Sequence, residues 1–292
     1  MGDKGIILAG GLGTRLYPVT KVISKQLLPV YDKPMIYYPL TTLMLAGIRE
    51  ILVITSMHEE YLFKDLLGNG EQWGISIQYA SQEYPRGIPD AFLIGKEFIG
   101  NSRICLILGD NIFFGQGLPS LLVETLDEDS HATIFGYWVE NPDRYGVLEF
   151  NSNGDVIGVQ EKPQNPRSHY VVPGLYFFDT NVVSLAEKLV PSERGELEIT
   201  DLIRHYIDAD KLKVKLMSRG MAWLDTGTHS ALLEASQFVE VIEKRQGLKI
   251  ASPEEVAWRK GYISSDQLCK LAKEYISNDY GRYLLNLTND NL

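Results

Sequence analysis

A glycine-rich segment near the start of the chain is the first stretch whose residue types could perform chemistry. It reads GIILAGGLGTRLYPVT and is followed within a few residues by KQLLPVYDKPMIYYPL. Glycines let backbone N–H groups approach an anion closely, and Arg15 would add a charged bidentate donor. The segment therefore predicts a phosphate-binding turn, although a tight strand-to-helix turn with an exposed arginine fits the glycines equally well.

Two common nucleotide-binding motifs do not fit this chain. A dinucleotide-binding turn has the pattern G-x-G-x-x-G; Gly11 and Gly13 match its first half, but position 16 is leucine. A P-loop ends in Gly-Lys-Ser or Gly-Lys-Thr, whereas the Gly95-Lys96 pair is followed by Glu97. Any phosphate site in this sequence must therefore have another form.

The overall composition limits what the chain could bind. Its 292 residues carry a formal net charge of −10, which argues against broad nucleic-acid binding because that requires a basic surface. No apolar run approaches the roughly 20 residues that a membrane crossing needs. The two cysteines, Cys105 and Cys269, suggest neither a disulfide framework nor a CxxC site. We expect a cytoplasmic protein without a membrane or nucleic-acid partner.

The elements that must position the glycine turn alternate in type along the first half of the chain. Short apolar runs at 6–8, 51–54, 75–79 and 104–108 predict strands, and helix-like patterns at 35–46, 59–67 and 88–98 separate them. This order predicts a parallel sheet covered by helices on both faces. Ligands of such sheets lie beyond the carboxyl ends of the strands, where the glycine turn and the Gly-Asp-Asn at 109–111 are found.

The pattern changes from about residue 132. Strand-like runs at 132–139, 146–150, 156–163, 170–178 and 212–217 are broken by Gly, Asn or Pro and predict antiparallel additions. Helical patterns cover 198–207, 230–244, 253–260 and 265–275. We expect an α/β fold with a Rossmann-like, mostly parallel twisted sheet flanked by helices. Residues 1–246 would form the core, in halves of about 1–130 and 131–246, and 247–292 a C-terminal helical extension.

Ordered sequence blocks over nearly the whole chain carry a family resemblance. The first segment, GGLGTRL followed by T, K, LLP and KP, resembles the signature of the sugar-phosphate nucleotidyltransferases. Further blocks are LGDNIFFG (108–115), RYGVLEF (144–150), EKP (161–163), GLYFFD (174–179), RGELEITD (194–201), AWLDTGTH (222–229) and EKRQGLK (243–249). Together they are most similar to the branch of that family that joins dTTP to glucose 1-phosphate.

The resemblance implies a reaction. A thymidylyl group would pass from dTTP to α-D-glucose 1-phosphate by Mg²⁺-assisted in-line displacement at the α-phosphorus, giving dTDP-glucose and pyrophosphate. This would be the first step of dTDP-L-rhamnose or other dTDP-deoxysugar synthesis. Two alternatives stay open: the same chemistry with UTP or another sugar 1-phosphate, and a non-catalytic nucleotide-binding regulatory homologue. The second is disfavoured because the charged residues of the family's site are all present.

The resemblance also assigns residues, position by position. The nucleotide-binding set would be Leu8, Gly10, Gly11, Gly13, Thr14, Arg15, Lys25, Gln26, Gln82 and Gly87. Asp110 and Asp225 would hold Mg²⁺, and they would act in catalysis with Arg15, Lys25 and Lys162. The sugar-phosphate set would be Asn111, Tyr145, Gly146, Glu161, Lys162, Val172, Tyr176, Arg194 and Trp223.

A loop beside the base site departs from the family pattern. It reads SQEYPRGIPDAF and contains Arg86, Pro89 and Asp90, whereas the family usually has an acidic or neutral residue at 86 and Ala-Gln at 89–90. Pro and Asp are both compatible with a first helical turn. Nucleotide selectivity is therefore less firmly implied than the type of reaction.

The family has a second nucleotide site at a subunit interface, where a downstream product such as dTDP-rhamnose inhibits. Its lining would be Leu45, Phe114, Gly115, Arg219, Lys249, Ala251, Ser252, Glu255 and Arg259. The resemblance implies a homotetramer as well. An ordinary packing helix is the alternative interpretation of residues 250–260.

Overall fold

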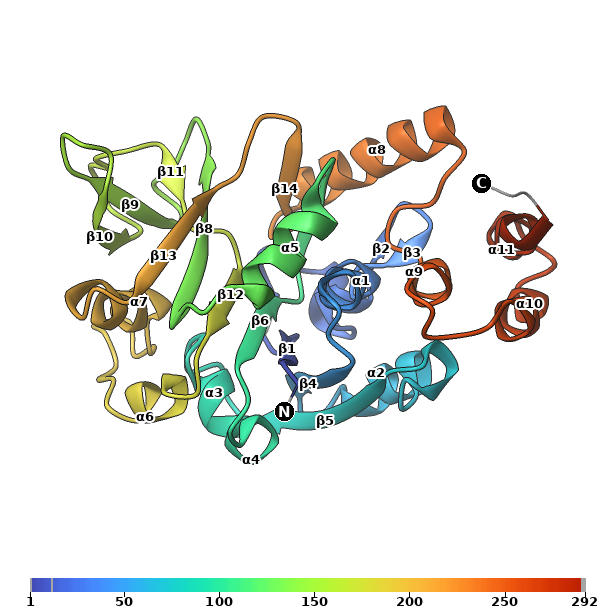
Figure 1. The fold of residues 1–292 in the computed structure, drawn as a ribbon, viewed down its shortest axis with the longest axis horizontal. Coiled ribbons are helices and arrows are strands. Elements are labelled where there is room, and N and C mark those ends of the chain that lie inside the picture. Colours follow the sequence, from blue (N-terminus) through green and yellow to red (C-terminus); the bar gives the residue numbers. More distant parts are fainter. Residues whose placement is uncertain (1, 12, 290–292) are drawn as a thin grey trace.

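A mixed ten-stranded sheet forms the centre of the computed structural model, which describes residues 2–11 and 13–289 (Figure 1). Its central part has the order β5-β4-β1-β6-β12-β8, and β13 pairs with the far side of β8. The bounds are β1 (Lys4–Leu8), β4 (Glu50–Ser56), β5 (Ser76–Gln82), β6 (Ile104–Leu108), β8 (Ala132–Trp138), β12 (Leu175–Phe178) and β13 (Leu212–Leu216). Among these seven strands, β12 runs antiparallel to the rest, so the expected mostly parallel sheet is confirmed.

Helices cover both faces of this sheet. They are α1 (Tyr37–Ala46), α2 (Glu60–Leu67), α3 (Asp90–Ile94), α4 (Lys96–Ile99), α5 (Leu118–Asp127), α6 (Val182–Ala186) and α7 (Ile199–Asp208). Side chains alternate along each strand, so Ile7 of β1 packs in the core beneath α1 while Ile6 packs in the core with α3, α6 and α7. Burial on both faces explains why β1, β4 and β6 are continuous apolar runs, whereas β5 and β13 are partly exposed and contain polar residues.

Smaller antiparallel pairs extend the sheet or stand beside it. β9 (Gly146–Phe150), β10 (Val156–Glu161) and β11 (Tyr170–Val171) continue one end of the sheet. β7 (Asn111–Gly115) pairs with β14 (Met221–Asp225), and β2 (Pro29–Val30) pairs with β3 (Lys33–Pro34). The antiparallel additions are therefore confirmed, but the expectation is wrong for β13, which pairs with β8 in parallel.

The C-terminal segment forms more helices than the sequence pattern predicts. The long helix α8 (His229–Gln246) is followed by α9 (Pro253–Arg259), α10 (Ser265–Glu274) and α11 (Asp279–Asn289), which lie together at one end of the molecule (Figure 1). Helix α11, which contains Gly281, was not among the expected helices. A Cβ at this position would lie 2.1 Å from the backbone oxygen of Tyr275, so glycine permits the close return of the chain.

Among the described residues, no helix combines the length and apolar character that a membrane crossing requires. The expected helix at 88–98 is divided at Gly95 into α3 and α4. Strands β1 and β6 end side by side, with Leu8 opposite Leu108, and the N–H of Gly109 donates to the carbonyl of Leu8 over 2.9 Å. The glycine turn and the Gly-Asp-Asn segment therefore leave the same edge of the sheet.

Candidate active site

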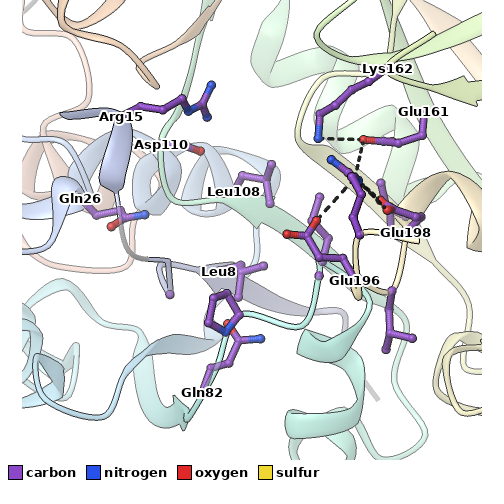
Figure 2. A pocket seen from close by; sticks show the side chains of 17 residues that line it. Leu8, Arg15, Gln26, Gln82, Leu108, Asp110, Glu161, Lys162, Glu196 and Glu198 are labelled. Atoms are coloured by element: carbon purple, nitrogen blue, oxygen red, sulfur yellow. Dashed lines mark hydrogen bonds and ion pairs between the residues drawn. The ribbon is translucent and has the colours of Figure 1, made fainter. Parts of the chain in front are cut away.

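Two adjoining cavities open at that edge of the sheet, with volumes of about 330 and 400 Å³. They share Arg15, Asp110, Glu161, Lys162 and Arg194 in their lining, so they form one continuous cleft. Figure 2 shows Arg15 and Asp110 on one wall and Lys162 and Glu161 on the opposite wall. The cleft is large enough for a small ligand with several polar groups.

Most residues of the expected nucleotide-binding set lie at one end of this cleft. Its lining includes Leu8, Gly10, Arg15, Gln26, Gln82 and Gly87. Gly11, Gly13 and Thr14 belong to the turn that connects Gly10 to Arg15, and Gly13 adopts a left-handed conformation with φ of 57°. Leu12, in the same turn, lies outside the described residues. The set therefore comes from the ends of β1 and β5 together with the segments that follow β1 and β5.

Lys25 and Asp110 form a partly buried ion pair beside the glycine turn. Lys25 Nζ contacts one carboxylate oxygen of Asp110, and Asn111 Nδ2 donates to the other over 2.9 Å. Burial by itself would raise the pKa of Asp110, but the charge of Lys25 and these hydrogen bonds lower it below its ordinary value. Asp110 is therefore held as a carboxylate.

Asp225 is brought beside Asp110 by the pairing of two short strands. It ends β14 opposite Asn111 of β7, and its Oδ1 accepts a hydrogen bond of 3.1 Å from the N–H of Gly227. A Cβ at Gly227 would lie 3.0 Å from both Asp225 Oδ1 and the Arg15 guanidinium, which places Arg15 near the same point. Burial and then the negative charge of Asp110 raise the pKa of Asp225. The site therefore contains a second carboxylate whose charge is poorly compensated.

The entire expected sugar-phosphate set lines the other end of the cleft. Asn111 Oδ1 accepts hydrogen bonds from the Trp223 indole N–H over 2.6 Å and from the N–H of Gly174 over 3.0 Å. The rings of Tyr145 and Trp223 pack edge to face with centroids 5.1 Å apart. These contacts hold Asn111, Trp223 and Tyr145 in fixed positions, and the three side chains form a rigid floor of the cleft. Such a floor is well suited to a ligand that must be held in one orientation.

Arg194 is surrounded by three carboxylates, of which the family resemblance singled out Glu161 but not Glu196 or Glu198. Its guanidinium contacts both oxygens of Glu198, at 2.8 and 2.7 Å, and lies 3.4 Å from Glu161 and 3.5 Å from Glu196. Hydrogen bonding to Glu198 raises the pKa of Arg194, while the same pair lowers the pKa of Glu198 despite its burial. Lys162 Nζ lies 3.1 Å from Glu161. Glu196 and Glu198 stand in the block RGELEITD, where their spacing from Arg194 could have indicated the pair.

A separate cavity of about 310 Å³ collects most of the expected second-site residues. Its lining includes Leu45, Phe114, Gly115, Lys249, Ala251, Ser252, Glu255 and Arg259. Arg219 is the exception, since it lies in another cavity with Tyr137 and Trp138. Within a single chain, Arg219 therefore does not join this set, because the loop between β13 and β14 carries it away from α9.

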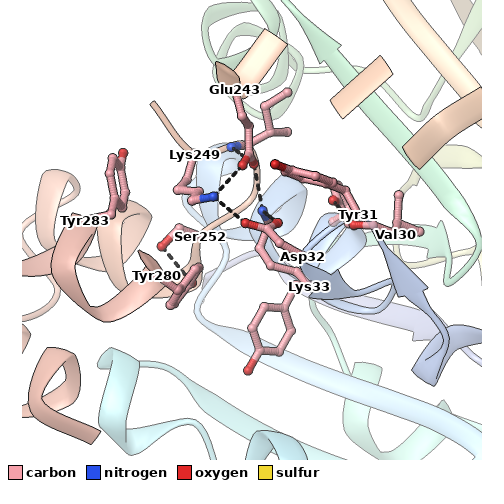
Figure 3. A network of polar contacts seen from close by, with 12 residues as sticks. Val30, Tyr31, Asp32, Lys33, Glu243, Lys249, Ser252, Tyr280 and Tyr283 are labelled. Carbon is pink, nitrogen blue, oxygen red and sulfur yellow. Dashed lines mark hydrogen bonds and ion pairs between the residues drawn. The ribbon is translucent and has the colours of Figure 1, made fainter. Parts of the chain in front are cut away.

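Lys249 is held in that cavity by a charged network (Figure 3). Its Nζ contacts Asp32 and lies 2.7 Å from Glu243. The buried Lys33 pairs with the same two carboxylates, at 2.7 Å from Glu243. The network joins the β2–β3 hairpin to the end of α8, so the cavity wall is tied to the segment that directly follows Lys25 and Gln26.

Comparison with known proteins agrees with this architecture. Residues 4–241 match the family described as nucleotidyl transferase. A glucose-1-phosphate thymidylyltransferase from Xanthomonas campestris pv. campestris is 58% identical over 281 residues, covering 96% of this chain and 95% of the relative. One from Neisseria meningitidis is 56% identical, covering 97% and 99%.

Solved structures show the same likeness. A Bacillus anthracis structure, described as a glucose-1-phosphate thymidylyltransferase in complex with sucrose, has a TM-score of 0.75 and 40% identity. The match covers 81% of this chain and 94% of that one. A UDP-glucose pyrophosphorylase complexed with UDP-glucose has a TM-score of 0.72 at 24% identity, covering 84% and 100%, which shows a shared fold.

Proposed function

The chain belongs to the nucleotidyl transferase family and, within it, to the glucose-1-phosphate thymidylyltransferases, and we propose that it transfers the thymidylyl group of dTTP to α-D-glucose 1-phosphate. The products are dTDP-glucose and pyrophosphate. The observation that carries the proposal is the single cleft in which Arg15 and Asp110 face Lys162 and Arg194. A nucleoside triphosphate at one end and a sugar phosphate at the other would meet between these groups.

Displacement at phosphorus needs alignment and positive charge more than covalent help from the protein. Arg15 and Lys25, next to the glycine turn, are placed to neutralise the triphosphate and the departing pyrophosphate. Lys162 and Arg194 are placed to hold the sugar phosphate so that its oxygen attacks opposite the leaving group. The rigid floor of Asn111 and Trp223 would orient the sugar.

Asp110 and Asp225 fit a Mg²⁺ ion. Two adjacent, partly buried carboxylates, of which Asp225 has a raised pKa, would be stabilised by a divalent cation, and carboxylate oxygens are ligands that Mg²⁺ prefers. In the described part of the chain no cluster of three or more His, Cys, Asp or Glu forms a metal site, so phosphate oxygens and water would complete the shell. When bound, the ion offsets the negative charge of the phosphates.

The decisive experiment is pyrophosphate release, measured with Mg²⁺ across a panel of nucleoside triphosphates and sugar 1-phosphates. We expect the highest kcat/KM with dTTP and glucose 1-phosphate. A maximum with UTP or with another sugar phosphate would keep the chemistry and change the substrate. Absence of release with every pair, in a protein that still binds dTTP, would favour a regulatory homologue and contradict the proposal.

The cavity beside α9 is our candidate for a second nucleotide site that regulates the enzyme. Lys249 and Arg259 supply positive charge there, and Phe114 and Leu45 supply an apolar surface. Arg219 could complete this lining only from a second copy of the chain, which supports a site at a subunit interface in a homotetramer. Residues 247–292 would then act as an extension of the 1–246 core that serves regulation, and a downstream dTDP-sugar such as dTDP-rhamnose would be the inhibitor.

Arg259→Ala tests this regulatory site. Removing the guanidinium should weaken inhibition by dTDP-rhamnose while kcat with dTTP and glucose 1-phosphate is retained. Arg282→Ala is a matched control, because Arg282 pairs with Asp279 on α11 away from this lining. Inhibition of undiminished strength in the Arg259 variant would remove the cavity from regulation.

A further inference from the structure

We propose that Asp90 is a positioning residue that fixes the side-chain amide of Gln82, so that the nucleotide pocket selects pyrimidine bases that carry a hydrogen on N3. The inference rests on the proposed function, because it concerns the nucleotide end of the same cleft. Neither residue would touch the reacting phosphorus. Their joint effect would be on which base is accepted.

The contact between the two side chains is buried and directional. Asp90 is 0% exposed at the start of α3, and Gln82 is 6% exposed at the end of β5. Gln82 Nε2 donates to Asp90 Oδ2 over 2.8 Å. Because Asp90 Oδ2 accepts this hydrogen bond, the NH₂ group of Gln82 faces Asp90. The carbonyl oxygen of the same amide must then face the other way.

That carbonyl oxygen, Oε1, lies toward the glycine turn. A Cβ added to Gly10 would be 2.9 Å from Gln82 Oε1, and both residues line the cleft. Figure 2 shows Gln82 below Leu8 at the nucleotide end. The pocket thus presents a hydrogen-bond acceptor at this wall. The orientation of the Gln82 amide is set by Asp90, which lies behind it.

Charge compensation explains how a buried carboxylate can be kept here. The Arg86 guanidinium lies 3.0 Å from Asp90 Oδ1 and compensates its charge, although this oxygen accepts no hydrogen bond from the described residues and the Arg86 side chain is largely exposed. Burial of a carboxylate without a compensating charge is strongly unfavourable, so a nearby cation is needed. Arg86 and Asp90 are two of the positions at which this loop departs from the family pattern, and the structure brings them together.

The loop that carries Arg86 is itself held in place. The N–H of Leu197 donates to the Arg86 carbonyl over 2.7 Å. At Gly87, which has φ of 102°, a Cβ would lie 2.0 Å from the Leu197 carbonyl, so another side chain would push the loop away. The loop beside Gln82 is therefore held in one position. Selection by a single hydrogen bond requires such a fixed environment around the acceptor.

A fixed acceptor distinguishes the pyrimidines by their N3 atom. Thymine and uracil carry N3–H and can donate to Gln82 Oε1. Cytosine has an unprotonated N3, so two acceptors would face each other and a buried polar group would be left unpaired. If the amide could rotate, its NH₂ group would serve cytosine instead, and this is what the Asp90 carboxylate prevents.

Asp90→Asn tests the proposal because asparagine offers both a donor and an acceptor to Gln82. We expect the ratio of kcat/KM for dTTP to that for dCTP to fall by about tenfold or more, the size of one unpaired polar group. The ratio of dTTP to dUTP should stay unchanged, since both bases carry N3–H. An unaltered dTTP to dCTP ratio, or equal losses with all three nucleotides, would overturn the proposal.

Gln82→Met provides an independent variant, and a double-mutant cycle links the two residues. The single change removes the acceptor and should by itself lower the dTTP to dCTP ratio, even if the Asp90 variant does not fold. Adding Asp90→Asn to it should lower the ratio no further, because Asp90 acts through Gln82. Additive effects, or a Gln82→Met ratio equal to wild type, would contradict this.

The outcomes separate this inference from the proposed function. Wild-type protein is assayed first with dTTP and glucose 1-phosphate, and lack of pyrophosphate release there would contradict the function. Normal release by the wild type with an unchanged dTTP to dCTP ratio in both variants would contradict the roles of Asp90 and Gln82 in base selection and leave the proposed function intact.

Discussion

The nucleotide end and the sugar end of the cleft both contain cations beside carboxylates, in different proportions. At the nucleotide end, Lys25 is paired with Asp110, and Asp225 is left with a raised pKa. At the sugar end, Arg194 is paired with both oxygens of Glu198 and lies near two further carboxylates. The nucleotide end has a carboxylate, Asp225, whose charge is not fully compensated. At the sugar end, Arg194 is already paired with carboxylates.

This difference indicates how each end would receive its ligand. In the proposed reaction, a divalent cation bound with the triphosphate would relieve the repulsion between Asp110 and Asp225. A sugar phosphate must instead share Arg194 with Glu198, so part of its attraction is offset by the existing pair. Charge at the nucleotide end should therefore matter most for turnover, and charge at the sugar end for substrate affinity.

Arg15→Ala should have the largest effect. Arg15 lies at the nucleotide end, close to Asp225, and should act on charge that develops during displacement. Removing one such donor should lower kcat by roughly 10²–10³-fold. Steady-state pyrophosphate release measures this, with Arg167→Ala on the exposed β9–β11 region as control. A fall of less than about tenfold would contradict the role.

Asp225→Asn should change the dependence on Mg²⁺. With one carboxylate lost, half-maximal activity should require at least about tenfold more Mg²⁺. Glu198→Gln is the matched comparison, because it removes a carboxylate from the sugar end. It should leave the Mg²⁺ concentration for half-maximal activity unchanged. Identical titrations for wild type and Asp225→Asn would exclude Asp225 from the metal site.

Arg194→Ala should act mainly on the second substrate. Loss of the guanidinium should raise KM for glucose 1-phosphate by about tenfold, the value of one charge-assisted contact, with KM for dTTP nearly unchanged. Initial rates with each substrate varied in turn provide the two constants. Equal increases in both would show that the two ends are not separable.

Glu198→Gln should have the smallest effect, on stability. The pKa of Glu198 is lowered in the fold, so its pair with Arg194 stabilises the protein above the ordinary glutamate value of 4.5 and is lost as pH falls through the lowered value. Because 43% of the Arg194 side chain is exposed, the difference at neutral pH should be under about 1 kcal/mol. Urea unfolding at pH 7 and at pH 3 measures it, and a difference that grew at acid pH would contradict the assignment.

Residue spacing was sufficient for the local features of this protein. The runs that became β1, β4, β6 and β8 are mostly buried and were visible as apolar segments, whereas β5 is partly exposed and only its first part was visible. The position of the glycine turn and of Asp110 beyond strand ends followed from that pattern. Alternation and strand-end rules depend on near neighbours, which is why a sequence displays them.

Tertiary structure alone decided which distant groups meet. The β7–β14 pairing places Asp225 beside Asp110, while β13 pairs in parallel where the pattern predicted otherwise. Glu198 forms an ion pair with Arg194, and Arg219 lines a different cavity from the one beside α9. Register between strands and the partner of a buried charge depend on packing across the whole fold, and the free energy of each contact is set by burial that no local pattern records.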